Sequence, residues 1–287
     1  MDVLCIGNLN YDISFHLSQL PAVHEKIRCE EATFSCGGSA GNTACWLGSL
    51  GISCGMVGAV GADAFGQAQI EDLHAHHVDT STVTVKGQSG IALIMVEGEA
   101  KRMIKYTGAN THKNVHNLPE CTHIHLSSNH RSVLETILEN RSSHQTLSWD
   151  PQELLFEEYL PFIEYVFINE DDLCRHTGKT SLEKAAHSLD GNTIIVTKNG
   201  GGCCIVTDAT IDVPSFGIEA IDTTGAGDAF DAGFIFGLLS RYNLTHCGIM
   251  GTACASLKVQ HHGARSGISS REDVNRFLSM HNAPFSL

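Results

Sequence analysis

The sequence predicts an α/β fold, in which helices cover both faces of a mainly parallel central sheet and a smaller β-sheet projects from it. Along most of the 287 residues, short apolar runs rich in β-branched residues alternate with helical patterns. This alternation is typical of βαβ units, whose parallel strands are buried between two helical layers. Two stretches, 11–35 and 79–107, carry strand-like runs with no helix between them, which predicts antiparallel strands in the smaller sheet.

Individual elements follow from the apolar runs and from the signals that end them. The runs place candidate strands, in chain order, at 3–7, 54–60, 91–96, 123–127, 146–149, 165–168, 193–197 and 203–207. Helical periodicity places helices at 41–50, 64–76, 131–140, 182–189, 228–240, 247–259 and 270–280. Gly51 directly follows the first helix, where a glycine can end it. Ser269 and Glu272 have the spacing of a capping box for the last helix.

The acidic composition argues against a nucleic-acid-binding surface. The formal net charge is −14, whereas such a surface needs clustered lysine and arginine to replace phosphate counterions. An anionic small molecule is still compatible with this charge, because backbone N–H groups can bind a phosphate without any lysine. Charged residues make up 17% and hydrophobic residues 42%, which is typical of a globular protein without a long disordered tail.

The cysteines and the N-terminal sequence predict a cytoplasmic protein. Eleven cysteines are present, and none of them forms a CxxC pair, so we interpret them as reduced thiols that pack like small hydrophobic residues. The N-terminus reads MDVLCIGN, with no basic segment of a signal peptide. No stretch of 18 apolar residues occurs, and therefore no membrane span is expected.

The strongest chemical signal is the heptapeptide DTTGAGD at 222–228, which opens an apolar helix. Two glycines allow a tight turn in which several N–H groups point at one spot, and the helix N-terminus adds partial positive charge there. The result is a cradle for a phosphate group. Asp228 lies beside it, where it could accept the proton of an attacking hydroxyl. An isolated aspartate would be interpreted as a helix cap, but the whole motif favours the catalytic interpretation.

Two weaker motifs lie near the N-terminus. The segment CGGSAGNTA at 36–44 is a glycine-rich turn that runs into a helix, and it could bind a phosphate or allow a polyol to approach the backbone. The segment GNLNYD at 7–12 follows the first strand and places Asn10 and Asp12 on one face, where they could bind sugar hydroxyls. Taken alone, the glycine-rich turn is a weak signal, and a turn with self-bonding side chains is the better interpretation of GNLNYD.

The histidine clusters do not have the pattern of a zinc site. His123 and His125 alternate on a predicted strand, while His74, His76 and His77 lie near a helix end, and neither group has companion ligands at zinc spacing. We interpret them as core and surface histidines. The segment TGKT at 177–180 lacks the upstream glycine of a P-loop.

These motifs together resemble the ribokinase-like (PfkB) family of sugar and nucleoside kinases. The resemblance runs through nearly the whole chain, from GNLNYD to GARSG, and DTTGAGD is its most specific part. It implies a ribokinase-like three-layer α/β/α sandwich with a β-sheet lid. It also implies that 1–287 form a single kinase domain, with lid strands from about 11–35 and 79–107.

The resemblance implies roles for individual residues of the reaction site. Asp228 corresponds to the catalytic base. The anion hole corresponds to Gly225, Ala226 and Gly227. The substrate positions correspond to Asn10, Asp12, Gly37, Gly38 and Asn42.

It further implies binding of ATP, Mg²⁺ and K⁺. The nucleotide positions correspond to Asn169, Thr197, Asn199, Gly200, Gly202 and Thr252, with Asn199 in place of a family glycine. The Mg²⁺ element corresponds to Asp172, where the family has a glutamate, with Glu170 as a substitute, both acting through water. The K⁺ positions correspond to Asp222 and Thr224 with the backbone of Lys258, His261 and Gly263.

The resemblance therefore implies an ATP-dependent kinase. Segments such as SWDPQE at 148–153 are most similar to archaeal nucleoside kinases, which favours the primary hydroxyl of a ribonucleoside as acceptor. A free sugar is the alternative, because GAN at 108–110 is similar to ribokinases. A non-catalytic sensor of nucleosides or nucleotides is the alternative from another class. The lid is a candidate homodimer interface, and neither nucleic acid nor membrane is expected as a partner.

Overall fold

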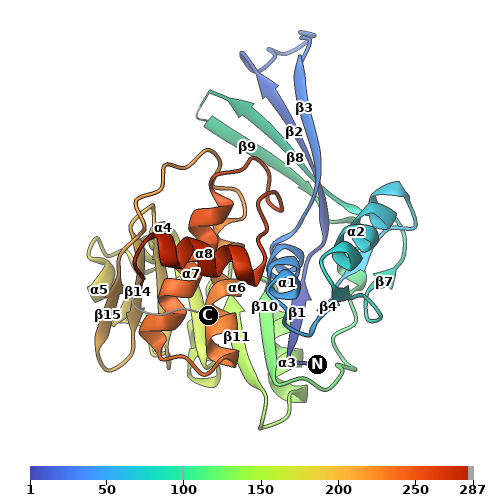
Figure 1. Ribbon diagram of the computed structural model, residues 1–287. Coiled ribbons are helices and arrows are strands. Elements are labelled where there is room, and N and C mark those ends of the chain that lie inside the picture. Colours follow the sequence, from blue (N-terminus) through green and yellow to red (C-terminus); the bar gives the residue numbers. More distant parts are fainter. Residues whose placement is uncertain (99, 284–287) are drawn as a thin grey trace.

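The computed structural model describes residues 1–98 and 100–283. In this part of the chain, nine strands form one large sheet with the order β15–β14–β13–β12–β11–β10–β1–β4–β6 (Figure 1). Their bounds are β1 Val3–Gly7, β4 Cys54–Val57, β6 Val78–Asp79, β10 His123–Ser127, β11 Thr146–Asp150, β12 Tyr165–Asn169, β13 Ile194–Lys198, β14 Gly202–Val206 and β15 Thr210–Val213. The strands from β6 to β13 are parallel, and β14 and β15 are antiparallel. The predicted mainly parallel sheet is confirmed.

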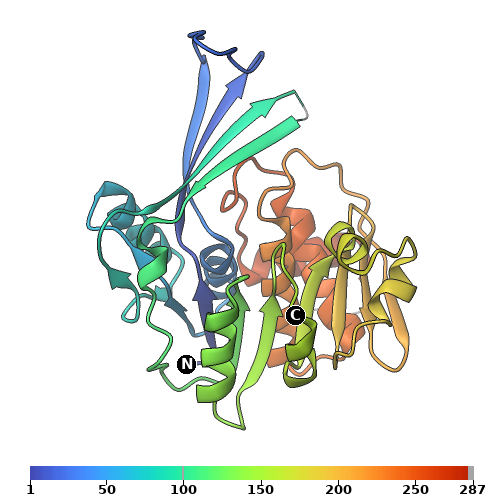
Figure 2. The ribbon, with the colours of Figure 1, turned by 180° about the vertical axis from the view of Figure 1, so that it is seen from behind.

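Helices cover both faces of this sheet and complete three layers (Figures 1 and 2). One face packs against α1 Ser39–Ser49, α2 Ala64–Ala75, α6 Ala226–Leu239, α7 Leu244–Lys258 and α8 Arg271–Met280. The other face packs against α3 Arg131–Asn140, α4 Glu170–Thr177, α5 Leu182–Ala186 and the 3₁₀ turn η2 Glu157–Phe162. Successive side chains of a strand point into the two apolar cores in turn. In β1, Cys5 belongs to the first core and Leu4 to the second, as expected for a sheet buried on both sides.

A second sheet projects beyond the end of the large one and is called the lid (top of Figure 1). Its order is β3–β2–β8–β9, with bounds β2 Asn10–Leu17, β3 Glu31–Gly37, β8 Gly90–Glu97 and β9 Ala100–Tyr106. The outer pairs are antiparallel, as predicted, but the central pair β2–β8 is parallel. The first part of the predicted stretch 79–107, before residue 90, does not belong to this sheet: β6 joins the large sheet, and β7 Thr84–Val85 pairs with β5 Ala59–Val60.

Other element boundaries also differ from the prediction. The strand expected at 54–60 is divided at Gly58, because β5 leaves the large sheet to pair with β7. The capping box of α8 is formed by Ser270 and Asp273, one residue later than expected. The glycine signal after α1 is confirmed, since Gly51 has a φ of +86° and donates its N–H to the oxygen of Gly48.

The thiols and the buried histidines agree with the sequence analysis. All eleven cysteines are free, and all of them lie in the described residues. His123 and His125 are buried in β10 and contact the hydroxyl of Ser148 at 2.8 and 2.9 Å. Burial lowers the pKa of His123 to about 4 and that of His125 to about 3, so both rings are neutral core groups. Within the described chain, no helix combines the length and the hydrophobicity that a membrane crossing requires.

Candidate active site

The loop 222–228 and the first turn of α6 form the centre of the candidate site. Gly225 precedes the helix with a φ of +79°, and a Cβ atom there would lie 2.6 Å from the carbonyl oxygen of Ala264. Only glycine therefore fits this turn without strain. Ala226 and Gly227 follow and line a cavity of about 590 Å³. Their N–H groups belong to the first turn of α6, where the helix itself offers no partners, and a helix N-terminus favours an anion. The N–H of Ala226 donates to the oxygen of Thr223 at 3.1 Å.

Asp228 occupies the third position of α6 and is 8% exposed. Its Oδ2 accepts a hydrogen bond of 2.7 Å from Nδ2 of Asn42 on α1. Burial raises the pKa of Asp228 to about 7, although the bond from Asn42 opposes this rise, and the carboxylate of Asp150 adds to it. A buried carboxylate that titrates near neutrality, beside a helix N-terminus, has the properties of a general base.

Arg265 orients Asn42, and the sequence analysis did not identify it as a site residue. Its guanidinium is 8% exposed; Nε donates to Oδ1 of Asn42 at 2.9 Å, and Nη2 donates to the oxygen of Gly37 at 2.9 Å. Nη1 forms an ion pair with Asp72 at 2.5 Å. Because Oδ1 of Asn42 accepts from Arg265, its Nδ2 must face Asp228. The GARSG segment was noticed only as part of the resemblance.

The expected substrate residues lie where the lid joins the large sheet. Asn10 and Asp12 share one face of β2, and β2 pairs Asn10 with Gly37 of β3. The carboxylate of Asp12 lies directly against Gly37, at the position that a Cβ atom would fill. Burial raises the pKa of Asp12 to about 6, while Arg265 and Lys105 oppose the rise. Gly38 has a φ of +93° and precedes α1, which carries Asn42.

Asn110 is a second residue that the sequence analysis left without a role. Its Nδ2 donates to Oδ1 of Asn10 at 2.8 Å, and its Oδ1 accepts from the backbone N–H of Leu9 at 2.9 Å. It belongs to the 3₁₀ turn η1 Gly108–His112. The turn therefore fixes the side chain of Asn10 from across the lid junction.

The expected nucleotide residues surround the 590 Å³ cavity. Among its lining residues are all six of them, Asn169, Thr197, Asn199, Gly200, Gly202 and Thr252. Apolar atoms of Phe230, Ala255 and Val259 line the same cavity. Glycine-rich backbone and apolar side chains thus meet in one space beside Ala226 and Gly227, which is the composition that a nucleotide needs.

The acidic element at the start of α4 reaches this cavity through Asp172. Asn169 caps the helix, because its Oδ1 accepts from the N–H of Asp172 at 2.8 Å. The carboxylate of Asp172 pairs with Arg175 at 2.5 Å and lines the cavity, whereas Glu170 is absent from the described lining. Asp171 accepts a bond of 2.9 Å from Nδ2 of Asn199. Oxygen ligands near a nucleotide suit Mg²⁺, and Asp172 is the one of the two expected carboxylates in the described lining of the cavity.

The residues expected to bind K⁺ lie together, but they hold a cation of the protein itself. Asp222 accepts from the N–H groups of Gly263 at 2.9 Å and Thr224 at 3.0 Å. Nζ of Lys258 donates to the carbonyl oxygens of Asp222 and His261, at 2.9 Å each. Lys258 was expected to contribute its backbone, and the structure instead places its side chain among these oxygens. The residues present therefore do not fit a K⁺ ion.

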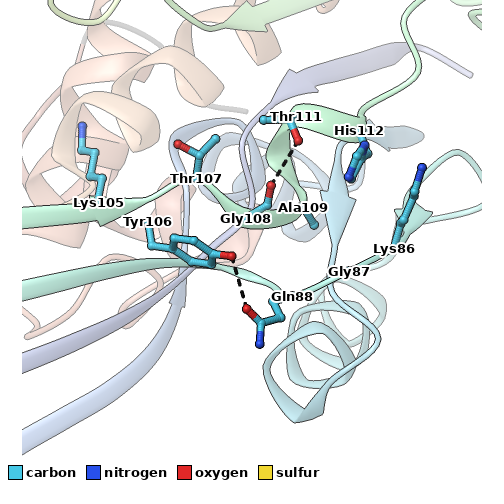
Figure 3. Close-up of a pocket in the computed structure, with 10 residues that line it drawn as sticks. All are labelled: Lys86, Gly87, Gln88, Lys105, Tyr106, Thr107, Gly108, Ala109, Thr111 and His112. Atoms are coloured by element: carbon cyan, nitrogen blue, oxygen red, sulfur yellow. Dashed lines mark hydrogen bonds between the residues drawn. The ribbon is translucent and has the colours of Figure 1, made fainter.

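A second hollow of about 610 Å³ lies at the base of the lid (Figure 3). It is lined by residues that precede β8, end β9 and form η1, namely Lys86, Gly87, Gln88, Lys105, Tyr106, Thr107, Gly108, Ala109, Thr111 and His112. The hydroxyl of Tyr106 donates to Oε1 of Gln88 at 3.2 Å across it. Three of its side chains, Lys86, Lys105 and His112, are basic.

Solved structures define the class to which this fold belongs. The ribokinase of Thermotoga maritima superimposes with a TM-score of 0.85 at 26% identity, covering 97% of this chain and 99% of the other. The nucleoside kinase of Methanocaldococcus jannaschii has a TM-score of 0.87 at 24% identity, covering 98% of each chain. The molecule is thus a ribokinase-like α/β protein, and the predicted fold class is confirmed.

Sequence comparison then identifies the family. The chain belongs to the pfkB family of carbohydrate kinases, whose profile matches residues 1–271, and it is an ATP-dependent kinase. An ATP-dependent ribose-1-phosphate kinase from Halopiger xanaduensis is 28% identical, covering 96% of this chain and 98% of the relative. A ribokinase from Lactococcus lactis is 26% identical, covering 96% of both chains. The relatives thus act on ribose-1-phosphate, nucleosides or sugars, which supports the kinase over the non-catalytic sensor.

Proposed function

We propose that this kinase transfers the γ-phosphate of ATP to the primary hydroxyl of a ribonucleoside, with Asp228 as the general base. The observation that carries the proposal is the position of Asp228. It lies in the helix turn whose Ala226 and Gly227 line the cavity that we assign to ATP, and it is hydrogen-bonded to Asn42 on the acceptor side. A base between the donor and acceptor sites is what direct in-line transfer requires.

The base, the anion hole and the Mg²⁺ position have separate roles in the proposed reaction. Asp228 accepts the proton of the acceptor hydroxyl as its oxygen attacks phosphorus. The N–H groups at Gly225, Ala226 and Gly227 stabilise the negative charge on the transferring phosphoryl group at the helix start. The N–H of Ala226 donates to the oxygen of Thr223 in this structure and exchanges that partner for the phosphate. Asp172, with Asn169, would hold Mg²⁺ through water, and this ion neutralises phosphate charge when it is bound.

The acceptor is held by the lid junction. Asn10 and Asp12 present oxygen and amide groups on one face of β2, and Gly37 and Gly38 let the carboxylate of Asp12 and the backbone of Asn8 pack closely against this turn. A ribose ring offers two secondary hydroxyls to this face while its primary hydroxyl points towards Asp228. Asn42 acts mainly on Asp228, since Arg265 fixes its amide.

A phosphorylated ribose is the second candidate acceptor. The observation that favours it is the basic lining of the hollow at the lid base, where Lys86, Lys105 and His112 surround a space large enough for a phosphate (Figure 3). The charge of Lys105 also acts on Asp12, which ties this hollow to the acceptor face. The relative from Halopiger xanaduensis is named as a ribose-1-phosphate kinase. Free ribose is the third candidate, on the strength of the ribokinase relatives.

Two further parts of the proposal concern the cell and the assembly. Eleven free thiols fit a reducing compartment, which supports a cytoplasmic location. One face of the lid exposes Phe34, Ile104 and Tyr106, and we propose this apolar surface as the contact of a homodimer.

A panel of acceptors tests the proposed function. Purified protein, ATP and Mg²⁺ are mixed separately with ribonucleosides, their 2′-deoxy analogues, ribose 1-phosphate and ribose, and ADP formation is measured. We expect a ribonucleoside to exceed its 2′-deoxy analogue by at least about tenfold in kcat/KM, because loss of one hydroxyl leaves a buried polar group unpaired. Higher turnover of ribose or ribose 1-phosphate than of every nucleoside would contradict the nucleoside assignment.

The same assay on Asp228→Asn tests the base. The variant should keep its fold and ATP binding, because the amide still accepts from Asn42, but turnover should fall by at least about 10²-fold. Circular dichroism and ATP titration serve as controls. Turnover near the wild-type value would refute the role of Asp228.

A further inference from the structure

Lys258 ends α7 with a side chain that is fully buried, although lysine is rarely buried without a partner. Its Nζ donates to the carbonyl oxygen of Asp222 and to that of His261, both at 2.9 Å. Its position at the end of a helix also favours positive charge, because the helix C-terminus carries partial negative charge. The ammonium therefore replaces its lost hydration with fixed oxygens of the backbone.

The two carbonyl groups belong to segments that shape the anion hole. Asp222 begins the 222–228 loop, and His261 lies in the loop that follows α7. The segments also meet through backbone bonds from Ile221 and Asp222 to the oxygen of Val259, at 2.7 and 3.1 Å. Gly225 packs closely against Ala264 of the second segment. The ammonium thus connects two loops whose relative position sets the direction of the anion-hole N–H groups.

Main-chain oxygens that converge on one point, beside an anionic carboxylate, are a typical environment for a monovalent cation. Burial opposes ionisation of Asp222, but bonds from Gly263 and Thr224 hold its pKa well below the usual range. This environment is the place that the sequence resemblance assigned to K⁺, and here Nζ of Lys258 occupies it. A lysine provides the same charge at the same oxygens, and it cannot leave the site because it is covalently part of the chain.

We propose that Lys258 is a built-in cation that positions the anion-hole loop, so that this kinase works without a monovalent metal ion. The proposal rests on the proposed function of the 225–227 loop. Lys101 of the lid provides the contrast within the same site. Its Nζ lies 3.0 Å from Oδ1 of Asp222, and its side chain is 49% exposed. Its described partners there are side-chain oxygens and not backbone oxygens. Lys258 is therefore a positioning residue and does not touch the reacting atoms.

Thermal unfolding tests the proposal without any substrate. Wild type, Lys258→Ala, Lys258→Met and Lys101→Ala are melted in choline chloride, NaCl and KCl at matched ionic strength. We expect the wild-type unfolding temperature to be the same in all three salts. Lys258→Ala should unfold about 5 °C lower in choline, and KCl should restore at least about half of this loss, because the removed side chain leaves room for the ion between two free carbonyl groups.

Two variants serve as matched controls. Lys258→Met removes the charge but fills the space, so KCl should not raise the unfolding temperature of this variant. Lys101→Ala removes an ammonium from Asp222 but leaves the buried oxygens paired, so that it should not acquire a response to KCl. Absence of any K⁺-specific effect on folded Lys258→Ala would overturn the proposal, and so would an equal effect on all three variants.

Turnover with the best acceptor of the panel supplies the second readout. Wild-type kcat should be equal within about twofold in choline, NaCl and KCl, and Lys258→Ala should gain at least about tenfold in kcat from KCl, with little change in KM for ATP. A wild-type enzyme that needs KCl overturns the proposal even if Lys258→Ala does not fold. Failure of every acceptor would count against the proposed function alone, because the melting experiment does not depend on it.

Discussion

The role proposed for Asp228 requires a charged side chain, whereas its burial opposes charge. Its carboxylate must be ionised to accept a proton, whereas burial raises its pKa to about 7 and favours the neutral form. The raised pKa makes the ionised base stronger than a surface aspartate, because a group with a higher pKa holds a proton more tightly. The same burial makes activity sensitive to pH near neutrality.

We expect kcat/KM to rise with pH through about 7, since only the deprotonated form of Asp228 acts as a base. Asp228→Asn should lose this rise in its residual activity. The profile should be measured at constant ionic strength and saturating Mg²⁺. A wild-type profile that is flat between pH 5.5 and 8.5 would contradict the assignment of the base.

Stability should change with pH in the opposite direction. A raised carboxyl pKa means that the folded state binds a proton that the unfolded state releases. The stability from Asp228 is therefore complete below the unfolded pKa of 3.8 and is lost as pH rises through about 7. The unfolding temperature of Asp228→Asn, relative to wild type, should accordingly increase from pH 5 to pH 8.

The sequence predicts individual residues unevenly. Asp228 and the neighbouring glycines were found because their motif is local, with a turn and a helix start in seven residues. Arg265 and Lys258 were not assigned through their side chains, because their partners are distant: Arg265 contacts Asn42 across 223 positions, and Lys258 contacts a backbone oxygen 36 positions away. A lysine in the last turn of a helix is usually solvated, so nothing in the sequence indicated its burial.

At the scale of elements, α4 serves two purposes with one short sequence. Asn169 ends β12 and caps the helix, which turns Asp172 towards the nucleotide cavity in the first turn. This helix was not predicted, because EDDLCRHT is short and mostly polar and has little apolar periodicity. Similarly, the strand expected at 54–60 could not be divided from sequence, since the partner of β5 is determined by the tertiary fold.

The position of α4 gives a prediction about magnesium. Asp172→Ala should lower kcat/KM more than Glu170→Ala, because Asp172 lines the cavity and Glu170 is absent from the described lining. The apparent affinity for Mg²⁺, measured by titrating the metal at fixed ATP, should weaken in the first variant alone. Glu170→Ala is the matched control, since it removes a carboxylate from the same turn. A larger effect of Glu170→Ala would show that Glu170, and not Asp172, is the carboxylate that serves Mg²⁺.

At the scale of the whole molecule, the lid touches the 222–228 loop through β9. Lys101 forms an ion pair of 3.0 Å with Asp222 and a hydrogen bond of 3.2 Å with Oγ1 of Thr224, across more than 120 positions of the chain. The pair is partly exposed, so it contributes about 1 kcal/mol or less and is screened by salt. This contact alone therefore contributes little to holding the lid in place.

We expect Lys101→Ala to lower kcat/KM by about fivefold or less, in line with the modest free energy of such a pair. The wild-type value should decline with ionic strength towards that of the variant, because salt weakens the interaction that the variant lacks. Steady-state kinetics between low and high salt check both statements. A salt dependence that is identical in the two proteins would contradict the role of this contact.

The connection between β2 and β3 has a consequence for the order of events in each catalytic cycle. Strand β2 leaves the body of the protein and strand β3 returns to it. At this junction β2 carries Asn10 and Asp12, and Asn10 pairs with Gly37 of β3. The lid therefore has no hinge that is separate from the acceptor-holding groups. If these residues bind the acceptor as proposed, any movement of the lid displaces them, and we expect product release to accompany lid opening.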